Sequence, residues 1–401
     1  MDSSTSYFVL AFAFFFLTSS ASLTASGGKH NVLDYGAKPD GRTDSSKAFL
    51  ATWEQACRST KPTTIYVPPS KFLLPTPSKF LLPKVAFRGP CKNNATSIRI
   101  DGTLVAPSDY RVLGEQWIFF ENVNGVSIFG GILDGRGIGL WTCKNSSRNC
   151  PTGATSLGFT KSKNIVIMGL TSLNSQMFHI VINGCQKVTM QGLRISASYR
   201  SPNTDGIHVQ LSDGVTILNT KIKTGDDCVS IGAGTTDLRI ENVVCGPGHG
   251  ISIGSLGKDL EEPGVQNVTV KNVTLTDSQN GLRIKSWGRP SNGFAKDILF
   301  QHVVMTHVQN PIVIDQNYCP DNKDCPGQAS GTKISNVTYK DIHGTSATQV
   351  AVKFDCSKKH PCTGIRLEDV KLTYRNRLAY ASCRNVDGIT ASGSVQPQSC
   401  L

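Results

Sequence analysis

Residues 203–232 read NTDGIHVQLSDGVTILNTKIKTGDDCVSIG, a stretch in which short polar clusters alternate with short apolar runs. Runs such as 215–218 (VTIL) and 229–231 (VSI) alternate apolar and polar side chains, which is typical of strands. The Gly, Asn and Asp residues between the runs are typical of turns. Up to residue 285 the chain contains four polar clusters: Asn203-Thr204-Asp205, Gly225-Asp226-Asp227, Gly248-His249-Gly250 and Arg283-Ile284-Lys285.

The spacing of these clusters indicates a solenoid. Asp226 follows Asp205 by 21 residues, His249 follows Asp226 by 23, and Arg283 follows His249 by 34. If one coil takes 21 to 23 residues, the first three clusters stack on one face, and the fourth joins them if residues 254–264 form a loop. Because neighbouring strands lie about 4.8 Å apart, three carboxylates, a histidine and two cations would then share one groove.

A loose repeat extends this pattern from residue 124 towards the C-terminus. Each unit is a turn residue followed by an alternating apolar run, and the first apolar residues of successive units are separated by 39, 23, 27, 23, 30, 30, 39 and 28 residues. A period in the twenties, with strands and without helical stretches, predicts an all-β fold, a right-handed parallel β-helix. An antiparallel sandwich would show hairpin signals about every 8–12 residues and is the weaker alternative. The units begin at Val126, Ile165, Val188, Val215, Leu238, Val268, Ile298, Val337 and Ile365.

The four clusters, in this order and at this spacing, resemble the signature motifs of the polygalacturonases, the pectin-hydrolysing enzymes of glycoside hydrolase family 28. Similarity to the plant members extends from about residue 31 to residue 400 and is greatest to the pollen-type enzymes. The resemblance implies a pectin-lyase-like β-helix that hydrolyses α-1,4 bonds of polygalacturonate with inversion, by exo-action, and without a metal or cofactor. Endo-action, a calcium-dependent pectate lyase and a non-catalytic wall-binding β-helix are the alternatives.

The resemblance also implies roles for single residues. Asp226 is expected to be the general acid, with Asp205 and Asp227 holding the attacking water. His249 is expected to support catalysis without donating the proton. The residues expected to bind substrate are Asn203, Arg283, Lys285 and Tyr318.

Taken by themselves, these residues allow other interpretations. Adjacent Asp226 and Asp227 would point to opposite faces of a regular strand, so both reach one groove only if the backbone bends at Gly225. Crowded carboxylates raise each other's pKa, which suits a general acid, but an Asp-Asp pair also occurs in calcium sites and in turns. Arg283 and Lys285 would share a strand face, where two cations repel unless an anion lies between them. We expect a galacturonate carboxylate to be that anion.

The N-terminal part of the chain differs from the repeats. Residues 45–58 place Ala48, Phe49, Trp53 and Ala56 on one helix face, and the resemblance implies a short helix that caps the solenoid. No linker is apparent, so a single catalytic domain is expected over residues 27–401. The segment 70–75 (SKFLLP) recurs at 78–83, and its prolines keep it out of a central strand.

The extreme N-terminus predicts export. The apolar run Phe8–Leu17 is too short to span a bilayer and is followed by small residues, so residues 1–26 are expected to be a signal peptide cleaved between about residues 22 and 28. Removing them deletes one Asp and no Lys or Arg, which leaves a net charge of 41 − 28 = +13. The resemblance implies secretion to the plant cell wall. There a basic protein suits an acidic polysaccharide as its partner rather than nucleic acid or a membrane. A monomer is expected.

Thirteen cysteines leave at least one unpaired. Spacing and the resemblance together suggest six disulfides, with Cys185 as a buried thiol: Cys57–Cys91, Cys143–Cys150, Cys228–Cys245, Cys319–Cys325, Cys356–Cys362 and Cys383–Cys400. Five Asn-x-Ser/Thr sequons occur, at Asn94, Asn145, Asn267, Asn272 and Asn336. Asn94 and Asn145 are the favoured glycosylation sites, because Asn267 and Asn336 stand where the repeat itself needs a turn residue.

Overall fold

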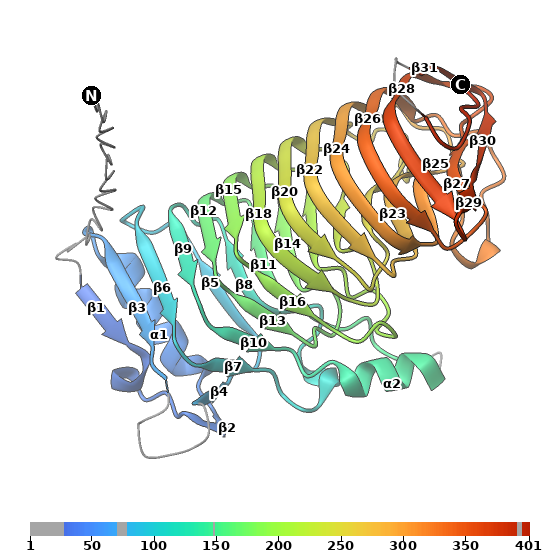
Figure 1. The fold of residues 1–401 in the computed structure, drawn as a ribbon. Helices are drawn as coiled ribbons and strands as arrows, with labels where there is room; N and C mark the ends of the chain where they lie inside the picture. Colours follow the sequence, from blue (N-terminus) through green and yellow to red (C-terminus); the bar gives the residue numbers. More distant parts are fainter. Residues whose placement is uncertain (1–27, 70–77, 147–148, 391–394) are drawn as a thin grey trace, which may run out of the picture.

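The computed structural model describes residues 28–69, 78–146, 149–390 and 395–401. Its strands wind into stacked coils, which form a parallel β-helix (Figure 1). The predicted signal peptide and the whole first copy of the repeated segment (residues 70–75) lie outside the described residues. No described helix is both long enough and apolar enough to cross a membrane.

Two sheets form the walls of the solenoid. The first, called the long sheet below, has 20 strands. Its pairings are parallel except for one antiparallel pair, β28 with β29. Its strands are β1 (Gly28–Asn31), β2 (Asp40–Asp44), β3 (Thr63–Val67), β4 (Lys79–Leu81), β6 (Thr96–Ile100), β7 (Thr103–Val105), β9 (Val126–Phe129), β10 (Ile132–Asp134), β12 (Lys163–Met168), β13 (Thr171–Leu173), β15 (Gln186–Gln191), β16 (Arg194–Ser196), β18 (Asp213–Lys223), β20 (Thr236–Cys245), β22 (Val265–Thr276), β24 (Phe294–Val308), β26 (Lys333–Ser346), β28 (Cys362–Tyr374), β29 (Arg377–Leu378) and β31 (Val386–Thr390).

The second sheet has 11 strands, and each strand pairs in parallel with that of the next coil. Its strands, in order along the solenoid, are β5 (Val85–Arg88), β8 (Gln116–Glu121), β11 (Thr155–Thr160), β14 (Ile180–Asn183), β17 (Ile207–Gln210), β19 (Val229–Ile231), β21 (Ile251–Leu256), β23 (Asn280–Trp287), β25 (Asn310–Tyr318), β27 (Val350–Asp355) and β30 (Tyr380–Arg384). The confirmed architecture follows from the repeat, because a period-2 apolar pattern supplies each coil with inward-pointing side chains.

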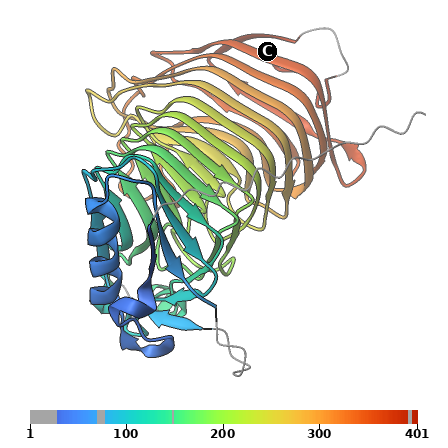
Figure 2. The ribbon, with the colours of Figure 1, turned by 90° about the vertical axis from the view of Figure 1, so that its left-hand side faces the viewer.

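The core is a continuous apolar column inside the coils. Inward positions of successive strands stack on one another, and Phe120 lies parallel to Phe159 at a ring-centroid distance of 4.6 Å. The expected capping helix is confirmed as α1 (Ser46–Arg58), which covers the N-terminal coils (Figure 2). Its Trp53 packs against Phe87 and Phe120. The helix therefore covers apolar side chains that an open coil end would expose to water.

A column of left-handed residues marks the corner at which the longest strands bend. These residues, called the corner ladder below, have φ between 49° and 56° and stand opposite one another in successive coils: Asn219, Asn242, Asn272, His302, Asp341 and Asp369. In its first rungs, Asn242 donates a side-chain hydrogen bond to Asn219 (3.0 Å) and Asn272 donates one to Asn242 (3.2 Å). Asn tolerates this backbone conformation better than most residues.

The sequons divide as the repeat predicts. Asn267 and Asn336 have positive φ and donate hydrogen bonds to Asp237 and Asp297 of the preceding coils, so they serve as turn residues. Asn94 is exposed in an irregular segment. Glycosylation of Asn94 and Asn145 stays a prediction.

The structure confirms the six disulfides, and Cys185 is a buried free thiol. The expectation that the repeats contain no helix was wrong, because α2 (Ile138–Ser146) lies between two coils. It buries only Leu140 and Trp141, and Asn145 is exposed near its end. So short an apolar face leaves little periodic signal in the sequence, and the predicted disulfide Cys143–Cys150 ties the end of the helix.

Candidate active site

The four polar clusters meet on the outer face of the second sheet, at its central coils. Arg283 lies on β23 between Leu282 and Ile284, whose side chains are buried in the core, so its own side chain points outward. By the same alternation Ser230 of β19 and Ser252 of β21 point outward, and the register places Ser230, Ser252 and Arg283 side by side in consecutive coils. The expected stacking of the clusters is therefore confirmed.

Asp227 is the hub of the site. Its side chain is 2% exposed and accepts three hydrogen bonds from three different strand residues. Oδ1 accepts from Ser252 Oγ at 2.8 Å and from an Arg283 guanidinium nitrogen at 2.9 Å, and Oδ2 accepts from Lys285 Nζ at 2.9 Å. Arg283 also donates from Nε to Ser252 Oγ at 3.0 Å. Two cations and a hydroxyl therefore surround this buried carboxyl group.

This geometry changes the interpretation of the two cations. The anion between Arg283 and Lys285 is Asp227 of the chain itself. Lys285 Nζ also lies 5.2 Å from the ring centroid of Tyr318, and that ring packs edge-on against Trp287. Binding of a substrate carboxylate by the remaining donors of the two cations stays a prediction.

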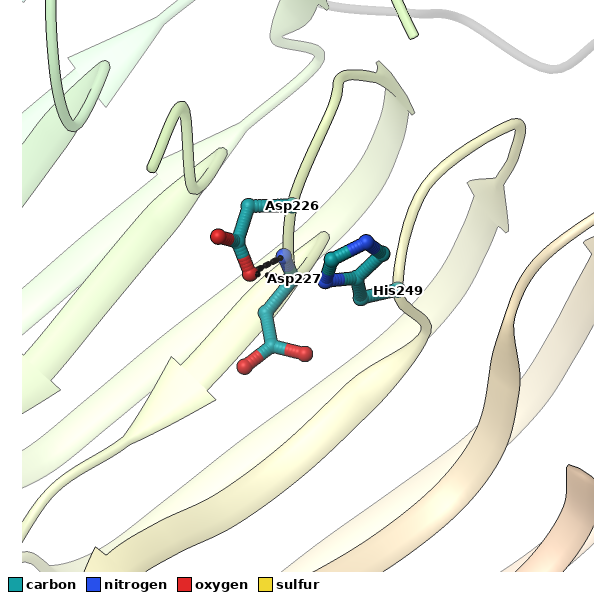
Figure 3. A group of neighbouring side chains, drawn as sticks. All are labelled: Asp226, Asp227 and His249. Atoms are coloured by element: carbon teal, nitrogen blue, oxygen red, sulfur yellow. Dashed lines mark hydrogen bonds and ion pairs between the residues drawn. The ribbon is translucent and has the colours of Figure 1, made fainter. Parts of the chain in front are cut away.

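Asp226 and His249 form a second pair above the hub (Figure 3). His249 Nδ1 lies 3.0 Å from Asp226 Oδ1, and the same oxygen accepts the backbone N–H of Asp227 at 2.8 Å. Both side chains are partly open to solvent, 19% for Asp226 and 35% for His249, whereas Asp227 is buried beneath them. Of these two adjacent carboxyl groups, Asp226 is thus the one that an incoming ligand can reach.

Glycines allow these loops to pass close to neighbouring coils. A Cβ at Gly225 would lie 2.2 Å from the carbonyl oxygen of Ser201, so the chain preceding Asp226 can approach the coil before it only without a side chain. Gly250 has φ of 85°, and a Cβ there would lie 2.1 Å from the carbonyl oxygen of Asn280. The clusters therefore keep their glycines for steric reasons as well as for conformational ones.

Asp205 is the most electrostatically strained of the three carboxyl groups. It is 6% exposed, and burial together with the charges of Asp226 and Asp227 raises the pKa of Asp205 well above its ordinary value. A hydrogen bond with Ser230 opposes this shift, and Ser230 Oγ in turn lies 2.7 Å from Nδ1 of His208. Asp205 therefore holds a proton at a pH where an exposed Asp has lost it.

The pKa of Asp226 is shifted in the opposite direction. Burial raises the pKa of Asp226, but the hydrogen bond and charge of His249 and the backbone N–H of Asp227 outweigh it, so the pKa lies below its ordinary value. His249 Nδ1 donates to Asp226 Oδ1 in the tautomer that carries a proton on Nδ1. In the other tautomer Nδ1 can accept a proton from a protonated Asp226.

Replacing Asp205 is expected to stabilise the fold increasingly as the pH rises. Because its pKa is raised in the folded state, folded Asp205 keeps a proton that the unfolded chain loses near pH ~3.9. The wild type thus loses stability as the pH rises above that value, whereas Asp205→Asn does not. Melting temperatures measured from pH 4 upward should diverge in favour of the variant. A pH-independent difference, or the same divergence in the exposed control Asp324→Asn, would contradict the assignment.

Several residues of the site were not predicted. His208 stacks on Phe178 and contacts Ser230, and Ser252 joins Asp227 to Arg283. Both residues occupy outward positions of their strands, and this alternation is visible in the sequence. The sequence alone did not show which outward positions lie next to the catalytic residues. Asn203, which was predicted, is exposed two residues before Asp205 and has a left-handed backbone (φ 58°).

The donor set of the site does not fit the calcium alternative. One ligand atom each from Asp226, Asp227 and His249 lies within 4.8 Å of the others. However, both oxygens of Asp227 already accept hydrogen bonds from cations, and calcium prefers six to eight oxygen ligands. A cation here would have to displace Arg283 or Lys285.

This face of the β-helix gathers three carboxyl groups, and paired carboxyl groups are what glycoside hydrolysis requires. The family model for glycosyl hydrolases family 28 matches residues 64–400, and the chain belongs to this family.

Individual relatives agree with this assignment. A polygalacturonase of Prunus persica is 65% identical over 399 residues, which are 99% of each chain. An exopolygalacturonase of Platanus acerifolia is 42% identical over 93% of this chain and 98% of its own. The solved polygalacturonase of Erwinia carotovora ssp. carotovora superposes with a TM-score of 0.69 at 25% identity, covering 91% of this chain and 96% of that one.

Proposed function

We propose that this family 28 enzyme hydrolyses α-1,4 bonds between galacturonate units of demethylated pectin. The observation that carries the proposal is the division of labour between the adjacent carboxyl groups, the accessible Asp226–His249 pair and the buried Asp227 with its two cations. The relatives named polygalacturonase and the basic charge of the chain support this substrate.

In the proposed mechanism Asp226 protonates the leaving oxygen. The pKa of Asp226 lies below its ordinary value in this structure, but substrate carboxylates add negative charge nearby and therefore favour its protonated form. Asp227, whose oxygens contact Arg283 and Lys285, holds the attacking water together with Asp205 and accepts the proton that the water loses. His249 passes the shared proton to and from Asp226 and thereby supports the acid without being it. No metal or cofactor takes part.

We also propose inversion at the anomeric carbon. The Asp226 and Asp227 ligand oxygens lie within 4.8 Å, closer than the roughly 6.5–9.5 Å usual for an inverting pair, so support for inversion comes from the family resemblance and not from this distance. Proton NMR of the first product formed from polygalacturonate should show the β-anomer. An initial α-anomer would contradict the proposed mechanism.

We further propose exo-action and export to the cell wall. The relative of Platanus acerifolia is named an exopolygalacturonase, and six disulfides are typical of proteins that fold in an oxidising compartment. We also propose a monomer, because the carboxyl groups, His249 and the two cations of the site contact one another within one chain.

Product analysis over time tests exo-action. Galacturonate monomer should appear from the first time point, with little loss of viscosity, because an exo-enzyme removes units from chain ends. A ladder of oligomers with a rapid fall in viscosity would establish endo-action instead. Unsaturated products that absorb ultraviolet light and disappear with a chelator would identify a lyase and overturn the hydrolytic proposal. The Asp226→Asn variant serves as the blank.

A further inference from the structure

The corner ladder changes its chemistry at its C-terminal end. Its first three rungs are Asn219, Asn242 and Asn272, but the next three are His302 of β24, Asp341 of β26 and Asp369 of β28. The backbone conformation is the same along the whole ladder, with φ between 49° and 56°. The backbone conformation therefore does not explain why a histidine and two carboxylates occupy the corner in three consecutive coils, since Asn fills the same corner in the coils before them.

A second histidine joins these rungs to form a compact cluster. His343, two residues after Asp341 on β26, lies opposite Lys371 of the next coil. Asp341 lies between two imidazole rings: its Oδ2 contacts Nδ1 of His302 and its Oδ1 contacts Nε2 of His343. Nε2 of His343 also lies 3.8 Å from Oδ2 of Asp369, and one ligand atom each from Asp341, His343 and Asp369 lies within 4.8 Å of the others.

The side chains of the cluster are reachable from solvent and are surrounded by ion pairs. Their exposed fractions lie between 31% and 46%. Lys371 Nζ contacts the other oxygen of Asp369 at 2.7 Å. Next to the cluster, Glu368 pairs with Lys340 at 3.0 Å and with Arg366 at 3.6 Å, so its charge is already balanced. Two carboxylates, one of them shared with a lysine, and the imidazole of His343 thus remain to receive a cation.

We propose that Asp341, His343 and Asp369 bind a divalent transition-metal ion of the zinc type, while His302 orients Asp341 from the preceding coil. Zn²⁺ is held by histidine nitrogens and carboxylate oxygens, and a site with three protein ligands takes a water as its fourth. Calcium and magnesium prefer all-oxygen sets and fit less well. A ring nitrogen ligates a metal only without its proton, so metal binding is expected to release protons.

The site lies apart from the catalytic residues. Its ligands belong to β26 and β28 of the long sheet, whereas the catalytic residues belong to strands of the second sheet and to the loops that enter it. Figure 1 labels β26 and β28 near the C-terminal end of the solenoid. Because one metal would join the consecutive coils of β26 and β28, it would stabilise the C-terminal part of the solenoid. The expected consequence is a higher melting temperature with zinc.

Zinc titration of the tag-free chain tests this inference. Isothermal titration calorimetry should show one Zn²⁺ bound, and Co²⁺ in its place should give the visible bands of a tetrahedral site. Asp341→Asn converts the rung to the residue that fills the corner elsewhere, so it should fold, and His343→Gln removes one nitrogen ligand. Loss of an outer-shell partner alone weakens metal binding by about 10–100-fold, and each variant should lose at least that much affinity.

A matched control comes from the same sheet. His307 contacts Asp277 at 3.0 Å as a single exposed pair with a left-handed backbone, and His307→Asn should leave zinc affinity and the zinc-dependent rise in melting temperature unchanged. In Asp341→Asn and His343→Gln, by contrast, the high zinc affinity and the zinc-dependent rise in melting temperature should both be lost. Absence of zinc binding by the wild-type chain, or equal binding by all variants, would overturn the proposal. Binding lost only in Asp226→Asn would place the metal at the catalytic residues and overturn it equally.

Discussion

Asp226→Asn is expected to lower kcat on polygalacturonate by about 10²–10⁴-fold, the usual contribution of a positioned general acid. Asn keeps the size of the side chain and can still accept the backbone N–H of Asp227, so the fold should be unchanged. What it cannot do is deliver a proton to the leaving oxygen. Steady-state kinetics, with melting temperature as a check on folding, measure the loss.

The same variant should recover on a substrate that needs no acid. With an aryl galacturonide whose nitrophenolate leaves unprotonated, Asp226→Asn should regain a large part of wild-type activity. Asp205→Asn and Asp227→Asn should not recover, because their function concerns the attacking water. If recovery instead appears with Asp227→Asn, the acid and the water-activating residue must be exchanged.

Lys285→Met is expected to impair both stability and activity. Lys285 is 9% exposed and Asp227 is 2% exposed, and removing one partner of a buried ion pair costs about 3–5 kcal/mol. The remaining contact with Arg283 places this variant towards the lower end of that range. Loss of a charge-assisted hydrogen bond should also lower kcat/KM by about 10–150-fold, equivalent to about 1.5–3 kcal/mol. Urea unfolding and kinetics measure the two effects.

Two controls separate this explanation from a general loss of positive charge. Lys221→Met removes an exposed lysine of β18 and should change the unfolding free energy by less than about 0.5 kcal/mol. The double variant Lys285→Met with Asp227→Asn should lose less stability than the sum of the two single variants, since both substitutions remove the same ion pair. Additive effects of the two substitutions would contradict the buried pair.

The fold could be predicted from the sequence because a solenoid repeats its signal. Turn residues such as Asn267 and Asp297 recur at coil spacing, and each is followed by an alternating apolar run that fills the core. The helix α2 could not be predicted, since it is an insertion that belongs to no repeat. A single short helix is not repeated in other coils, so the sequence offers no second copy with which its pattern could be compared.

The candidate site could be predicted only in part. Spacing brought Asp205, Asp226 and His249 together, and the structure does so too. The contacts of Arg283 and Lys285 with Asp227 could not be foreseen, because the length of a coil places a side chain on a face without saying which neighbour it meets. Sequence patterns specify the coil, whereas hydrogen-bond partners depend on the bends between coils.

The parallel pairing of each strand with the next coil has a consequence for how the enzyme is built during synthesis. The catalytic clusters come from neighbouring coils between residues 203 and 285, so every contact among them is local compared with the length of the chain. Folding of a solenoid can begin in one region and spread from coil to coil. The active centre can therefore assemble once these coils and their immediate neighbours have left the ribosome, before the C-terminal coils exist. Duplication or loss of a distant coil would lengthen or shorten the wall without disturbing the chemistry.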